Sequence, residues 1–234
     1  MCFSPEADLA GAVVVGVIGV DALRHASRPR DVPLASVPLV FAAHSLTETF
    51  VWWGLQGDVS RSVGRHATWL YLLVALVVVP ILAPVAVTIA EPRGPRRRLM
   101  TLLSILGIGV GLVMLVAVAT GPLHAQIQGH HISYSLPLPF GTQLTVLYVV
   151  ATCGVLLVSS SRRVAIFGLL NLIAVALLTW LMVSAFISLW CSWAALTSIA
   201  IAFHLRHPEQ PPPPLDPQHH PARAASATPP SVRV

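Results

Sequence analysis

The chain has 234 residues, of which 55% are hydrophobic and only 10% are charged. Soluble globular domains carry about 25% charged residues, so most of this surface must face lipid rather than water. All 14 basic residues are arginine. Without a lysine the chain cannot hold retinal as a Schiff base, which excludes a retinal protein, and we expect no nucleic-acid partner.

A helix needs roughly 20 apolar residues to cross a bilayer core of about 30 Å. The sequence predicts an all-α bundle of seven such transmembrane helices. In chain order they cover about residues 5–23, 33–55, 67–90, 99–120, 142–159, 164–184 and 188–205. The last two come from one apolar stretch that carries no obvious turn signal. As a single helix this stretch would be about twice as long as the bilayer is thick, so we divide it near residues 184–188.

Three of the predicted helices contain signals for their ends or their packing. The first begins with Ser4 as N-cap and Pro5 in the first turn, and Asp8 there favours the positive end of the helix dipole. In the third, two prolines are expected to bend the helix and shape a cavity. In the fourth, Gly107 and Gly111 are spaced for close contact with a neighbouring helix.

The positions of the arginines predict the orientation. The first, third and fifth connections and the tail hold all of them except Arg61 and Arg65. By the positive-inside rule, the N-terminus then lies outside and the C-terminus lies in the cytoplasm. The Arg96–Arg98 cluster is expected to contact anionic lipid headgroups, and Asp21 is expected to pair with Arg24.

The chain divides into a transmembrane domain, residues 1–206, and a tail, residues 207–234. The tail contains four consecutive prolines and too few apolar residues to bury a core, so it is expected to be disordered and cytoplasmic. A partner-binding proline run is the alternative interpretation of this tail, and protein partners cannot be named from it.

The second predicted helix carries polar side chains that a bilayer disfavours. His44, Glu48 and Trp52 follow one another at intervals of four residues and therefore share a face. A proton relay, a metal site, a ligand anchor and a structural hydrogen-bond pair between helices are all compatible with this pattern. Trp52 also falls in a belt of tryptophans at the predicted outer boundary, together with Trp53 and Trp69.

Further candidate ligands lie in the fourth connection and near the outer ends of two helices. Tyr134 is expected at the rim of a ligand pocket above Glu48. His130, His131, Cys191 and Cys2 are candidate ligands for zinc or copper. The alternatives are an ordered outer loop that covers the bundle, a disulfide between the two cysteines, and plain packing.

Several short segments together resemble a known family. They are Met1–Ser4, His44–Gly54, Glu91–Pro92, Gly129–Tyr134 and Leu189–Cys191. As a set they resemble an uncharacterised bacterial multi-pass membrane family, the domain of unknown function 6629. The resemblance covers the chain to about Leu205. It implies a single seven-helix domain in a bacterial plasma membrane and lends no activity.

The sequence favours a membrane protein that binds a small ligand or a metal in an outward-facing polar pocket, as a sensor or transporter component. His44 and Glu48 would form the floor of this pocket. A membrane-embedded metal-dependent enzyme with Glu48 as acid/base and a structural or assembly protein are the alternatives, and no catalytic residue is assigned.

Overall fold

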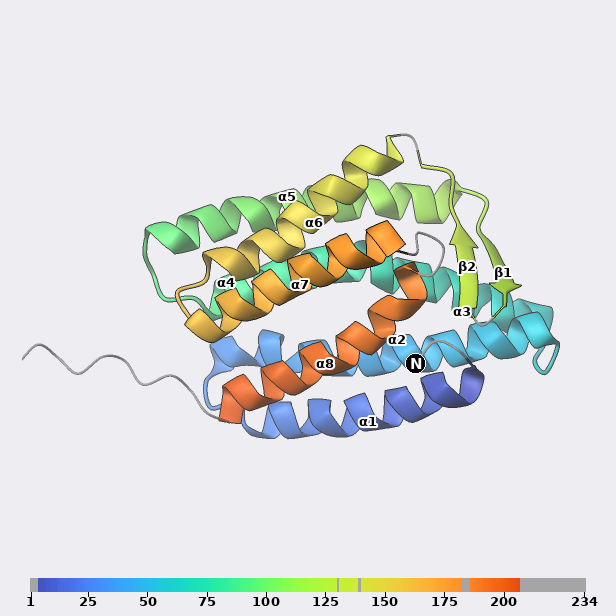
Figure 1. The fold of residues 1–234 in the computed structure, drawn as a ribbon, viewed down its shortest axis with the longest axis horizontal. Coiled ribbons are helices and arrows are strands. Elements are labelled where there is room, and N and C mark those ends of the chain that lie inside the picture. The colour runs from blue at the N-terminus through green and yellow to red at the C-terminus, as the bar shows by residue number, and fades with distance from the viewer. Residues whose placement is uncertain (1–3, 130, 139, 182–185, 207–234) are drawn as a thin grey trace, which may run out of the picture.

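The computed structural model describes residues 4–129, 131–138, 140–181 and 186–206, with side chains described outside residues 178–195. Its helices lie roughly side by side, and a two-stranded sheet covers one end (Figure 1). In chain order the elements are α1 (Pro5–Arg24), α2 (Val32–Gln56), α3 (Arg61–Leu73), α4 (Val79–Ala90), α5 (Pro95–Thr120), β1 (His124–Gln128), β2 (His131–Ser135), α6 (Gly141–Val158), α7 (Arg162–Leu181) and α8 (Phe186–Arg206).

These bounds confirm the predicted helical segments. A π-helical turn, Val74–Val78, joins α3 to α4, so the two form one long helical segment as expected. The long apolar stretch after Arg162 forms two helices, α7 up to Leu181 and α8 from Phe186. The predicted place of the division, near residues 184–188, lies partly outside the described residues. The all-α prediction is wrong in one place: the fourth connection forms an antiparallel hairpin of β1 and β2.

Within the described part of the chain, four helices are long and apolar enough to cross a membrane. They are Pro29–Gln56, Arg61–Ala90, Pro95–Thr120 and Gly141–Val158. The outer surface of α5 is also apolar, since Leu102, Ile105 and Val116 are all exposed. Monomeric soluble proteins rarely expose apolar surface on this scale, so the chain is a membrane protein.

The inward face of α5 packs closely on α4, as the glycine spacing predicts. A Cβ added to Gly107 would overlap the carbonyl oxygen of Pro80, and one added to Gly111 would come within 2.8 Å of Ile81 Cδ1. Pro84 cannot donate to the Pro80 carbonyl as an ordinary helical residue would, because proline has no N–H. The Gly107 backbone on α5 therefore lies against the Pro80 carbonyl of α4, which lacks its usual helical donor because residue 84 is a proline.

The π-helical turn has a partner on another helix. In this turn the Val79 N–H donates to the carbonyl of Val74, five residues earlier. The same spacing would pair the Ala75 carbonyl with residue 80, which is a proline and has no donor. The hydroxyl of Tyr148 on α6 donates to this carbonyl at 3.1 Å. A side chain thus supplies the hydrogen bond that the backbone cannot make.

The two ends of the bundle differ in charge and structure. The α1–α2, α4–α5 and α6–α7 connections and the end of α8 lie at one end, and the hairpin lies at the other (Figure 1). At the first end, Arg206 binds Asp21 through two contacts of 2.7 and 2.8 Å. The ion-pair partner of Asp21 is therefore Arg206 and not Arg24, the partner expected from the sequence. We call this end the arginine-rich end.

Glu91, at the end of α4, binds the turn between α6 and α7. Its carboxylate accepts hydrogen bonds from the Ser159 hydroxyl and from the Ser160 backbone N–H, at 3.0 and 2.9 Å. These bonds connect the end of α4 to the turn between α6 and α7. Glu91 therefore fixes one helix end against another at the arginine-rich end.

Candidate functional site

One face of α2 carries the polar residues that the sequence singles out, and that face is buried. His44, Glu48 and Trp52 are all inaccessible or nearly so, and Glu48 has no exposed surface. Their four-residue spacing sets them in a row along the half of α2 that lies nearer the hairpin. A carboxylate in this position needs a proton, a cation or strong donors, because burial disfavours its charged form.

Three aromatic rings form a stack that begins at His44 of this row. The His44 ring stacks on Tyr71 of α3 with centroids 4.0 Å apart and planes within 13°. Tyr71 stacks in turn on Tyr134 of β2, at 4.6 Å and 16°. The Tyr134 hydroxyl reaches Glu48 Oε1 at 3.5 Å, a long hydrogen bond. We call His44, Tyr71 and Tyr134 the ring stack; it joins two helices and the hairpin around Glu48.

A second carboxylate lies in the same half of the bundle, nearer the hairpin. Asp8 on α1 has no exposed surface, and its Oδ2 accepts a hydrogen bond from the indole N–H of Trp52 at 3.0 Å. Trp52 is therefore a buried link between α1 and α2 rather than a lipid-facing anchor of the aromatic belt. Because Trp52 lies one turn from Glu48 on α2, the two carboxylates belong to neighbouring layers of one buried polar region.

The hairpin covers this region because its sequence alternates. Ile132 and Tyr134 are two residues apart and so lie on one face of β2. Ile132 is almost fully buried among residues of α2, α3 and α5, and Tyr134 contacts the ring stack. Gly129 begins the turn between the strands with φ +61°, a left-handed conformation that tight hairpin turns require.

The structure brings together the four predicted ligand-binding residues, His44, Glu48, Trp52 and Tyr134, around one buried region. The predicted metal ligands are placed differently. The strand alternation puts His131 on the opposite face of β2 from Tyr134.

The other three candidate metal ligands are not described. His130 and Cys2 lie outside the described residues, and so does the side chain of Cys191, whose backbone belongs to α8. Among the residues that are described, no group of three or more His, Cys, Asp or Glu side chains could hold a metal ion.

Two members of the site are not predicted from the sequence. Asp8 reads as a helix-dipole residue in the first turn of α1, and its burial depends on Trp52 of another helix. Tyr71 is the central ring of the stack, but in the sequence it is one aromatic residue within an apolar segment. Its hydroxyl is a polar group that a buried position must satisfy, which is the signal that could have identified it.

Comparison with known proteins gives a family and no function. The model of a family of unknown function, DUF6629, matches residues 1–214. No curated protein and no solved structure matches the chain. The activity must therefore be argued from the buried polar region itself.

Proposed function

Since the chain belongs to the family of unknown function DUF6629, which assigns no activity, we propose a function from the site: the protein binds a small cation in the outer half of a seven-helix membrane bundle. Asp8 and Glu48 would supply the negative charge, and the ring stack would supply aromatic surface. The hairpin would act as the cover of the site. The protein would then serve as a sensor or a transporter component in a bacterial plasma membrane.

The observation that carries this proposal is the complete burial of two carboxylates on adjacent helices. Intramembrane carboxylates are costly, and they commonly mark ion or proton sites. Trp52 and Tyr134 border the same region, and aromatic faces attract cations. Tyr134 lies on a short hairpin, so a modest displacement of β2 would open the region toward the outer surface.

A structural role is the second candidate, and the Trp52–Asp8 hydrogen bond favours it. Buried polar pairs between helices can serve only to hold a bundle together, each contributing about 0.6 kcal/mol on average in membrane proteins. On this interpretation Glu48 would be protonated and would need no ligand.

Thermal unfolding of the purified protein separates the two candidates. The probes are zinc, copper, calcium and tetramethylammonium chlorides, each titrated against the wild type and a Glu48→Gln variant. A cation that binds only the folded state should stabilise the wild type by about 2.7 kcal/mol at one hundred times its Kd. Glu48→Gln should abolish this stabilisation.

Glu6→Gln is the matched control, because Glu6 is an exposed carboxylate near the same end of the bundle. It should respond to the cation as the wild type does. A folded Glu48→Gln protein with an unchanged response would end the cation proposal. A wild type that responds to none of the four salts would leave the structural role as the better account.

A further inference from the structure

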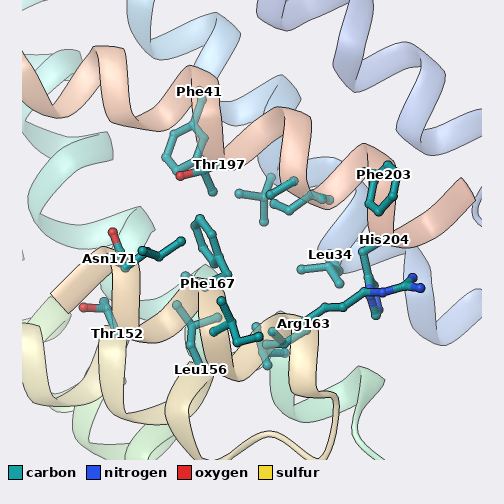
Figure 2. A pocket seen from close by; sticks show the side chains of 18 of the residues that line it. Leu34, Phe41, Thr152, Leu156, Arg163, Phe167, Asn171, Thr197, Phe203 and His204 are labelled. Atoms are coloured by element: carbon teal, nitrogen blue, oxygen red, sulfur yellow. The ribbon is translucent and has the colours of Figure 1, made fainter. Parts of the chain in front are cut away.

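A second feature of the bundle lies away from the buried carboxylates. A cavity of about 390 Å³ opens among α2, α4, α6, α7 and α8, and Figure 2 shows its side chains. This volume falls within the range of about 300–1,000 Å³ typical of small-molecule sites. Most of the described lining is aliphatic or aromatic, including Val37, Phe41, Val87, Leu156, Phe167 and Ile201.

The two basic side chains of this cavity lie at the arginine-rich end, and its uncharged polar side chains, Thr152, Asn171 and Thr197, lie farther along it. Arg163 is the second residue of α7, and His204 lies in the last turn of α8; both line the cavity (Figure 2). The Arg163 guanidinium lies 5.7 Å from the ring centroid of Phe203, a cation–π distance that draws it toward α8. The cavity is thus mostly apolar and is basic at one end.

The side of the cavity between α7 and α8 faces outward. Among the residues that the structure describes, these two helices contact each other less than α6 and α7 do. Ile166, Leu170 and Phe203 line the cavity and are also exposed on the surface of the bundle. Apolar side chains exposed on a membrane-embedded helix face hydrocarbon chains, so the cavity is reached from the bilayer.

We propose that this cavity holds one acyl chain of an anionic phospholipid, drawn from the leaflet at the arginine-rich end. The apolar lining takes the chain, and Arg163 and His204 contact the phosphate. A guanidinium suits this role because its planar N–H groups can bind two phosphate oxygens at once. Arg206 at the same end of the bundle pairs with Asp21 and does not line the cavity, whereas Arg163 does.

The Arg96–Arg98 cluster is expected to contact lipid headgroups alone. The cavity, in contrast, takes the acyl chain of the lipid while Arg163 contacts its phosphate. It is also independent of the cation site. Arg163 and Glu48 belong to different regions of the molecule, so either proposal can fail while the other stands.

Native mass spectrometry of the delipidated, detergent-solubilised protein tests the proposal. The probes are phosphatidylglycerol and phosphatidylcholine with identical acyl chains, and free oleic acid as competitor. The wild type should bind phosphatidylglycerol more tightly than phosphatidylcholine. Arg163→Gln should lower phosphatidylglycerol affinity about fivefold, the amount expected for one basic residue at a membrane surface, and leave phosphatidylcholine affinity unchanged.

Arg162→Gln is the matched control, since Arg162 precedes Arg163 on α7 and does not line the cavity. Ala200→Leu narrows the apolar part and should reduce binding of both phospholipids; Ala83→Leu does the same from α4 if the first variant fails to fold. Equal losses in Arg162→Gln and Arg163→Gln would overturn the proposal. So would unchanged binding in a folded cavity-narrowing variant, or displacement of phosphatidylglycerol by equimolar oleic acid.

Discussion

At the scale of single residues, Trp52 shows how burial changes the role of a side chain. Its position near the end of α2 suits a belt of tryptophans at the membrane surface, where one ring edge meets water. In the fold it is buried, and its indole N–H finds its partner in Asp8. The tryptophan therefore stabilises the contact of α1 with α2 and positions a carboxylate at the same time.

We expect Trp52→Phe to lower the free energy of unfolding by about 1–3 kcal/mol. The substitution removes the donor and leaves a buried carboxylate oxygen without this bond, which costs more than a neutral hydrogen bond contributes. Denaturant titration in detergent, followed by circular dichroism, measures the change.

Trp53→Phe is the control for loss of ring size. Trp53 is only partly buried and contacts Phe50 edge to face, a contact that a phenyl ring can retain. Its substitution should cost less than about 0.5 kcal/mol. Similar losses at the two positions would mean that the bond to Asp8 contributes little.

At the scale of elements, the contact between α4 and α5 depends on two glycines of α5, which have no side chain. Gly107 lies against the Pro80 carbonyl, and a Cβ added to Gly111 would come within 2.8 Å of Ile81 Cδ1 and 3.2 Å of the Val77 carbonyl oxygen. The two glycines are four residues apart, one turn of helix, so they form a single smooth strip along α5.

We expect Gly107→Ala to destabilise the bundle by about 1–3 kcal/mol, the usual cost of overpacking a tight contact. The added methyl group would overlap a backbone oxygen of a rigid, proline-bounded segment that cannot easily move. Thermal unfolding of the purified variant measures this loss.

Gly109→Ala is the control on the same helix, and we expect it to cause no loss of stability. A Cβ at Gly109 would meet nothing within 4 Å, so the substitution should be neutral or should stabilise α5 through its better helix propensity. A loss at Gly109 as large as that at Gly107 would show that helix insertion, rather than the α4 contact, limits stability.

At the scale of the whole molecule, the proposed orientation is open to a direct test. Among the described residues, the arginine-rich end carries ten arginines, and the hairpin end carries Arg61 and Arg65. We expect the α4–α5 connection, which contains Arg96–Arg98, to lie in the cytoplasm and the hairpin to lie outside.

Reporter fusions in a bacterial host measure this orientation. Alkaline phosphatase fused within residues 121–141 should be active, and green fluorescent protein fused there should be dark; fusions at residues 93–98 should behave in the opposite way. Placement of both segments in one compartment would contradict the seven-span arrangement.

Hydrophobic run length locates the helices because each span needs about the same apolar length. It misses the polar first turns of two of them: α3 begins at Arg61, six residues before the predicted start, and α5 begins at Pro95, four residues before. The hairpin was not predicted: β1 and β2 are short and polar in part, and Gly129 is their main turn signal. The α2 face of the site could be read from its four-residue spacing. Asp8 and Tyr71 could not, because their roles depend on contacts between distant segments.

The ion pair between Asp21 and Arg206 has a consequence for biogenesis. It joins the first helix to the last, and α8 also packs against α2. In the proposed seven-span arrangement a nascent chain inserts its helices from the N-terminus onward, so the flank of α1 and α2 stays open until α8 has been made. A premature stop codon before α8 would leave that flank without its packing partner and would remove the Arg206 partner of Asp21, so we expect the truncated chain to be degraded faster than the full chain.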